Sequence, residues 1–192
     1  MQKLAGIVLI VGSLLFIIAA FMPITIKVVT ESDPQKRGEH IQNDRTGWLV
    51  VNILFGAGSV VAVVGLALFA LHAQSIGDNP NVKLVSYLAP IAAALGTLFW
   101  VIISYNRVAL PPQEAASNLG VNSWMFPAYT VLMQIALMIV GFVLIQGAYP
   151  GWLGWGVMVL GGLSLVAYLV FKDMPPFAHY VPLLVMGIVL VI

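Results

Sequence analysis

The stretch Trp48–Leu71, WLVVNILFGAGSVVAVVGLALFAL, is an apolar run without a charged side chain. A helix advances by roughly 1.5 Å per residue, so it needs about 20 apolar residues to cross a hydrocarbon core roughly 30 Å thick. The run exceeds that length. It therefore predicts a transmembrane helix and sets the expectation for the chain on either side of it.

Four other runs meet the same criterion, namely Leu4–Met22, Leu84–Tyr105, Ala128–Ala148 and Trp152–Phe171. A last run, Ala178–Ile192, is shorter than a full crossing. It fits either a sixth span that begins near Pro175-Pro176 or a re-entrant segment. We expect an all-α integral membrane protein with one domain over residues 1–192. It should be a bundle of about six transmembrane helices, with spans at about 4–22, 48–71, 84–105, 128–148, 152–171 and 176–192.

The composition agrees with a bilayer environment and excludes several functions. Hydrophobic residues make up 61% of the chain and charged residues 8%, whereas soluble domains carry about a quarter charged residues. The net charge of +1 offers no basic footprint, so we expect no nucleic-acid partner. The chain has no cysteine, which excludes disulfides, thiol catalysis and iron–sulfur clusters. We expect no cofactor.

Two of the connecting loops are long enough to hold short surface helices. In loop one, Pro23–Thr46, the triplet Ser32-Asp33-Pro34 is typical of an N-cap followed by proline in the first turn of a helix. In loop three, Leu110–Gly120, the pair Pro111-Pro112 opens a polar stretch, and Gly120 stands where a C-cap would be. We expect one short surface helix in each loop.

The acidic residues indicate what the spans do not do. No lysine or arginine lies deep in a span. All seven acidic residues lie outside the six runs: Glu31, Asp33, Glu39, Asp44, Asp78, Glu114 and Asp173. Proton pumps and ion-coupled transporters usually carry a titratable group at membrane depth. The pattern argues against those classes and leaves a passive pore or a binder of apolar molecules. We interpret the three histidines, His40, His72 and His179, as interfacial polar residues, and we expect no metal site.

One span carries an ordered polar face. Arg45, Trp48, Asn52, Phe55 and Ser59 follow a helical period along the second span. Such a face could bind an anionic lipid or a polar-headed apolar ligand, with Gln134 of the fourth span at a depth similar to that of Asn52. The alternative is that Asn52, Ser59 and Gln134 hold neighbouring helices together. The candidate ligand-binding residues are therefore Arg45, Trp48, Asn52, Ser59 and Gln134.

The orientation of the spans stays open. Loops one, three and five hold six basic residues, which would place them in the cytoplasm, but the short N-terminal tail with Lys3 opposes this arrangement. The segment from Ser32-Asp33-Pro34 through Trp48 and Asn52 loosely resembles the layout of small six-helix bacterial or archaeal membrane proteins of unassigned function. The resemblance implies a prokaryotic cell membrane and carries no function with it.

Three functional hypotheses follow. The first is a non-catalytic accessory or scaffold subunit of a larger membrane assembly, with membrane lipids, other subunits or a second copy as partners. The second is a small transporter or binder of a lipid-like or apolar molecule, lined by Asn52, Ser59 and Gln134. The third is a lipid-modifying enzyme, which is disfavoured because the candidate acids and bases lie at the surface.

Overall fold

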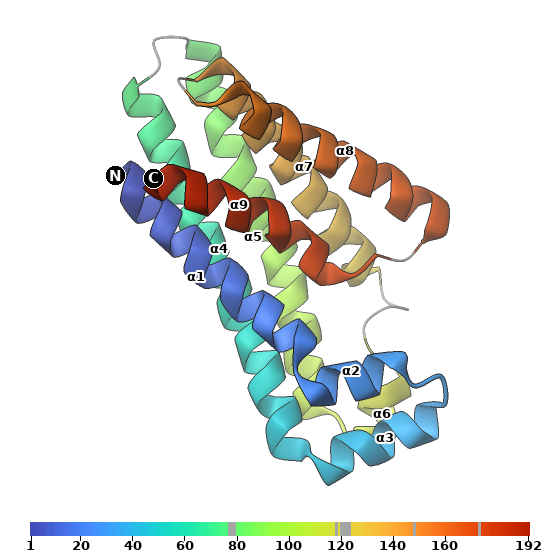
Figure 1. Cartoon of the computed structure of the whole chain (residues 1–192). Helices are drawn as coiled ribbons and strands as arrows, with labels where there is room; N and C mark the ends of the chain where they lie inside the picture. Colours follow the sequence, from blue (N-terminus) through green and yellow to red (C-terminus); the bar gives the residue numbers. More distant parts are fainter. Residues whose placement is uncertain (77–79, 118, 120–123, 148, 173) are drawn as a thin grey trace.

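The computed structural model describes residues 1–76, 80–117, 119, 124–147, 149–172 and 174–192, and within these residues the ordered elements are helices (Figure 1). There are nine α-helices and one short 3₁₀ helix in this part of the chain: α1 (Gln2–Phe21), α2 (Pro23–Thr30), α3 (Pro34–Asn43), α4 (Arg45–Ile76), α5 (Pro80–Ala109), α6 (Pro112–Ser117), α7 (Met125–Gln146), α8 (Gly151–Phe171), η1 (Pro176–His179) and α9 (Tyr180–Val191).

Five of these helices, α1, α4, α5, α7 and α8, are long and apolar enough to cross a membrane. Length and composition therefore make the chain a helical multi-pass membrane protein. The sixth predicted span differs from the other five, because α9 has 12 residues and follows a 3₁₀ turn. It is the shortest of the six apolar segments, as predicted, and it is too short to count as a long membrane helix.

Three short helices, α2, α3 and α6, form a surface layer at one end of the long helices (Figure 1). The predicted helix in loop one is confirmed, because α3 begins at Pro34 and the Asp33 side chain accepts a hydrogen bond of 2.8 Å from the Gln35 backbone N–H. The predicted helix in loop three is confirmed by α6. The expected C-cap at Gly120 lies outside the described residues.

Helix α2 was not predicted from the sequence. Pro23 disfavours helical geometry at Met22, whose backbone is extended, and so ends α1. The same proline then occupies the first turn of α2, where its missing N–H costs nothing. One residue therefore both ends a membrane helix and starts a surface helix.

The long helices pack as a series of neighbours, α1 on α4, α4 on α5, α5 on α7 and α7 on α8. Helix α9 returns along α1, and the Gln2 side-chain amide donates a hydrogen bond of 3.2 Å to the Leu190 carbonyl. The two termini therefore lie side by side, away from the surface layer (Figure 1).

Candidate ligand cavity

A cluster of aromatic rings lies inside the bundle, in the half that is nearer to the surface layer. Phe16 of α1 stacks on Tyr180 of α9 with ring centroids 3.9 Å apart, and it lies 4.7 Å from Phe55 of α4. Trp100 of α5 stacks on Tyr129 of α7 at 4.8 Å and meets Phe55 edge-on at 5.6 Å. Four long helices and α9 thus meet through large rings at this level.

Between this aromatic cluster and the surface layer lies a cavity of about 700 Å³. Its volume falls in the range of roughly 300–1,000 Å³ that is typical of small-molecule sites. The described residues that line it come from α1 to α7 and from the segment before α9: Phe16, Ala20, Phe21, Thr25, Ile26, Val29, Thr30, Arg37, Trp48, Phe55, Trp100, Arg107, Ser117, Leu119, Phe126, Met174, Pro175, Pro176 and Phe177.

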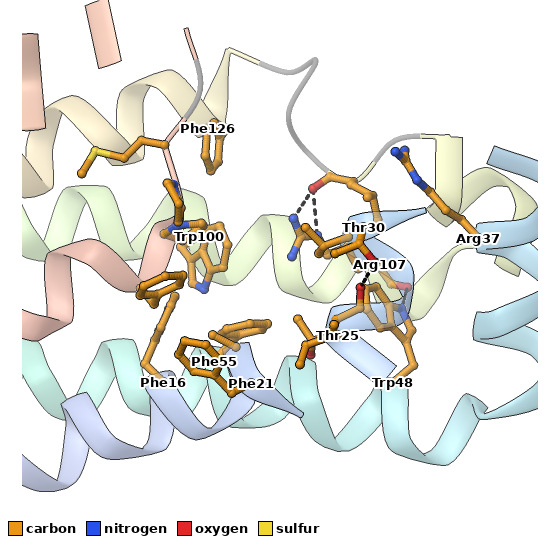
Figure 2. A pocket seen from close by; sticks show the side chains of 18 of the residues that line it. Phe16, Phe21, Thr25, Thr30, Arg37, Trp48, Phe55, Trp100, Arg107 and Phe126 are labelled. Atoms are coloured by element: carbon orange, nitrogen blue, oxygen red, sulfur yellow. Dashed lines mark hydrogen bonds between the residues drawn. The ribbon is translucent and has the colours of Figure 1, made fainter. Parts of the chain in front are cut away.

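The cavity has an aromatic end and a cationic end (Figure 2). Phe16, Phe55, Trp100 and Phe126 lie together at one end of the view, while Arg107 and, beyond it, Arg37 lie toward the other. Along α4 the wall runs from Trp48 to Phe55, a distance of about 10 Å at roughly 1.5 Å per residue. The two ends are therefore separated by a length that one amphiphilic molecule can span.

Arg107 is anchored by main-chain contacts. Its Nε donates a hydrogen bond of 2.9 Å to the Leu119 carbonyl, and its Nη2 donates to the same oxygen. Its own carbonyl accepts a hydrogen bond of 2.9 Å from the Trp48 indole N–H, and its guanidinium carbon lies 5.1 Å from the centre of the Trp100 ring system. The guanidinium is thus held in place while its other N–H groups stay free of described protein partners.

Arg37 is held in a similar way, because its Nε donates a hydrogen bond to the Glu31 carbonyl. Neither Arg37 nor Arg107 forms an ion pair with a carboxylate of the described chain. The described lining contains these two arginines and no aspartate or glutamate. A cavity with two cations, low-dielectric walls and no compensating acid attracts anions.

The predicted site residues are divided between the cavity and the core behind it. Trp48 lines the cavity, whereas Arg45 is exposed and lines only a separate hollow of about 60 Å³, whose wall also includes Trp48 and Arg107. Asn52 and Ser59 are buried and do not appear in the cavity wall. The Asn52 amide donates 2.8 Å to the Trp48 carbonyl, and the Ser59 hydroxyl donates 2.8 Å to the Phe55 carbonyl, both within α4.

Gln134 belongs to a buried polar group next to the cavity. Its amide nitrogen lies 2.8 Å from His179 Nδ1 and donates to the Met174 sulfur at 3.4 Å, and no hydrogen bond to Asn52 is found among the described residues. The interfacial interpretation of His179 was wrong, because that side chain is fully buried. A polar side chain inside a membrane bundle needs protein partners, and Gln134 supplies one. A ligand-binding role for the five predicted residues stays a prediction.

Sequence reasoning missed both arginines of the cavity. Arg107 stands at the end of α5 and Arg37 in a polar surface helix, so each resembles an ordinary interfacial cation in the sequence. The available signal was weak: Arg107 follows Trp100 at helical spacing, which places both on one face of α5. In the described part of the chain, no three His, Cys, Asp or Glu side chains gather as they would to hold a metal.

No family model, curated protein or solved structure matches this chain.

Proposed function

We propose that this protein binds an amphiphile with an anionic head group in the cavity below the surface layer, as a lipid binder or small lipid carrier. One observation supports the proposal above all others: a cavity of about 700 Å³ carries two arginines toward one end and aromatic rings at the other. An anionic head would meet Arg37 and Arg107, and an apolar chain would lie against Phe16, Phe55 and Phe126.

The chemistry of the cationic end favours a phosphate or carboxylate head. A guanidinium presents N–H groups in a planar fork that matches these anions, and hydrogen bonds to a charged partner contribute roughly 1.5–3 kcal/mol each. Three hydroxyl side chains, Thr25, Thr30 and Ser117, also line the cavity and donate to carbonyls of their own segments or a neighbouring one. Their remaining lone pairs suit a hydroxyl-bearing head group.

We also propose that η1 and α9 together form the sixth transmembrane segment. Phe177 of η1 packs against Phe21 at the end of α1, with ring centroids 5.2 Å apart, and Leu190 bonds Gln2 at its beginning. The segment formed by η1 and α9 therefore lies beside α1 from one end of that helix to the other. An even number of crossings places both termini on one side, and Lys27, Lys36 and Arg37 of the surface layer favour its location in the cytoplasm.

A second candidate, an accessory subunit of a larger assembly, is supported by α8. This helix packs mainly on α7, and it has the smallest buried share of the five long helices. Trp152, Trp155 and Leu163 on its outer face are exposed. Lipid or another membrane helix could cover that face. A catalytic role has less support, because no carboxylate or imidazole is found in the described lining of the cavity.

The proposal is tested with three amphiphiles of equal chain length, offered to the purified protein in detergent: dodecyl phosphate, dodecyl maltoside and dodecyl trimethylammonium. Dodecyl phosphate should quench Trp fluorescence saturably, and the other two should not. Arg37→Gln and Arg107→Gln should each lower its affinity by about 10–100-fold, the loss expected for a hydrogen bond to a charged group. Arg45→Gln, which removes an exposed arginine outside the cavity, is the matched control and should bind normally.

Thermal unfolding of each variant separates lost binding from lost fold. A folded Arg37→Gln Arg107→Gln double variant that binds dodecyl phosphate as tightly as the original chain would refute the proposal. Equal binding of the cationic amphiphile would also count against it.

A further inference from the structure

We infer that the cavity takes its ligand sideways from the bilayer, through a portal between the α1–α2 corner and the segment 175–177, so that the ligand is an anionic phospholipid whose chains extend into the membrane. The inference rests on the proposed function and adds the source and class of the ligand. It is carried by residues that line the cavity and are at the same time exposed on the outside of the bundle.

The first side of the portal consists of Phe21, Ile26 and Val29. All three line the cavity, and their side chains are 58%, 45% and 61% exposed. A mouth that opens to water would carry polar side chains, because exposing this much apolar surface to water is unfavourable. Apolar exposure at the rim of a cavity in a membrane protein instead indicates contact with lipid.

The position of Phe21 on α1 gives the direction of the opening. Val11, Leu14, Ile18 and Phe21 follow the helical period, and all four are exposed, so they form one stripe along α1. Val11 and Leu14 lie within the apolar length of a long membrane helix, where the exposed face meets hydrocarbon. The portal therefore lies at the end of a face of α1 that is in contact with lipid.

The second side of the portal is the chain before α9. Pro175, Pro176 and Phe177 line the cavity, and the Phe177 ring lies 5.2 Å from that of Phe21. These two rings come from segments far apart in sequence and touch across the rim. Prolines leave this segment without the N–H groups that would need partners in an apolar setting.

The depth of the cavity suits a lipid that stays in its leaflet. Arg107 lies near the surface-layer end of α5, and Trp100 lies about 10 Å deeper at roughly 1.5 Å per residue. Arg107 is thus at the level of head groups and the aromatic rings are in the outer hydrocarbon. A phosphate bound to the arginines would leave its acyl chains beside Phe21 and Phe177, where the portal lets them pass into the bilayer.

The absence of cysteine from the chain allows the portal to be closed chemically. A Phe21→Cys Phe177→Cys variant is reconstituted in phosphatidylcholine vesicles that contain phosphatidic acid with a pyrene-labelled acyl chain. A short bifunctional methanethiosulfonate bridges the two thiols, and a reductant opens the bridge again. With the three exposed tryptophans, Trp124, Trp152 and Trp155, replaced by phenylalanine, energy transfer from Trp100 and Trp48 to pyrene reports occupancy, and dilution with unlabelled vesicles reports the exchange rate.

Bridging should slow the exchange of the labelled phosphatidic acid at least tenfold, and reduction should restore it. A Leu14→Cys Ile18→Cys variant, bridged in the same way on the same stripe of α1 and outside the cavity wall, is the matched control and should exchange at the unbridged rate. Ile26→Glu keeps both rings and places a negative charge at the rim. Because that charge repels an anionic lipid, this variant should also exchange more slowly.

The outcomes separate the two proposals. Unchanged exchange in the bridged variant, with binding still lost in Arg107→Gln, would overturn the portal and leave the binding proposal intact. Butyl phosphate can enter from water past Thr30 and Ser117, the exposed polar residues of the cavity lining, so it should bind weakly and be indifferent to bridging at the apolar rim. Tight binding of butyl phosphate without any energy transfer to the labelled lipid would also overturn the lipid assignment. Loss of binding for every phosphate in every state would overturn both proposals.

Discussion

The two ends of helix α1 pack in opposite ways. From its N-terminal end to its midpoint, α1 approaches its neighbours through glycines: a Cβ added at Gly12 would lie 2.5 Å from the Ala62 nitrogen, and one added at Gly6 would lie 2.7 Å from the Gly187 carbonyl oxygen. Toward the surface layer, the same helix contributes Phe16 and Phe21, whose rings border a cavity of about 700 Å³.

The difference shows how a bundle with few charges can pack its helices closely at one end and still contain a cavity at the other. In lipid no hydrophobic force draws helices together, so close contact between small residues holds α1 to α4 and α9. Large rings at the other end meet one another before the backbones do, and the space beyond them stays open. The glycine end supplies stability and the aromatic end supplies the candidate site, and the following predictions test that division.

The largest effect is expected at Gly12. In Gly12→Leu the new side chain would collide with the Ala62 backbone, and overpacking of this kind should cost about 3 kcal/mol or more. Thermal unfolding in detergent measures the loss. Gly56→Leu is the matched control, since a Cβ at Gly56 meets nothing within 4 Å, and its unfolding temperature should stay close to that of the original chain.

The next largest effect concerns ligand binding at the cationic end. Arg107→Lys keeps the positive charge and loses the planar fork that Leu119 holds in place, so affinity for dodecyl phosphate should fall by about tenfold, or roughly 1.4 kcal/mol. Arg45→Lys, at the exposed arginine outside the cavity, should change nothing. Equal affinity in both variants would mean that only net charge matters at this end.

A smaller loss of stability is expected where the two ends meet. The Tyr180 hydroxyl donates a hydrogen bond of 2.8 Å to Ser59, and both side chains are fully buried. Tyr180→Phe keeps the stacking on Phe16. It removes that bond and the long bond of 3.5 Å that the Tyr180 oxygen accepts from the Tyr129 hydroxyl, which together should cost about 1 kcal/mol of unfolding free energy. Binding of dodecyl phosphate should be unaffected; a loss of binding would extend the site behind the aromatic cluster.

The smallest effect is expected at Asn52. Its amide donates to the Trp48 carbonyl of its own helix, and it is absent from the cavity wall, so Asn52→Leu should cost about 0.6 kcal/mol, a typical value for a polar contact in a membrane bundle. Dodecyl phosphate should bind this variant normally. If this variant lost binding while its unfolding temperature stayed normal, Asn52 would be part of the binding site, as the polar face of the second span predicted.

The positions of the long helices and the apolar environment that they need could be predicted from the amino-acid sequence. Hydrophobic length is a local property, so the runs around Leu4–Met22 and Trp48–Leu71 could be recognised without their neighbours. The caps were equally local, as the Asp33 cap of α3 shows. Helix α2 was missed because Pro23 ends one helix and begins another in a single step, which the pattern alone does not separate from a loop.

Which polar residues share a site depends on how the helices pack, and the sequence did not predict it. Arg37 and Arg107 lie on helices separated by the whole of α4, and no periodicity links them. The polar residues of α4 were correctly predicted to share one helix. Trp48 lines the cavity, however, whereas the side chains of Asn52 and Ser59 donate hydrogen bonds to carbonyls of the same helix. His179 is a core residue because η1 packs on α7, where Gln134 and Tyr129 contact its ring. Helix formation depends on neighbours a few residues away, whereas a cavity depends on which helices meet and how bulky their facing side chains are.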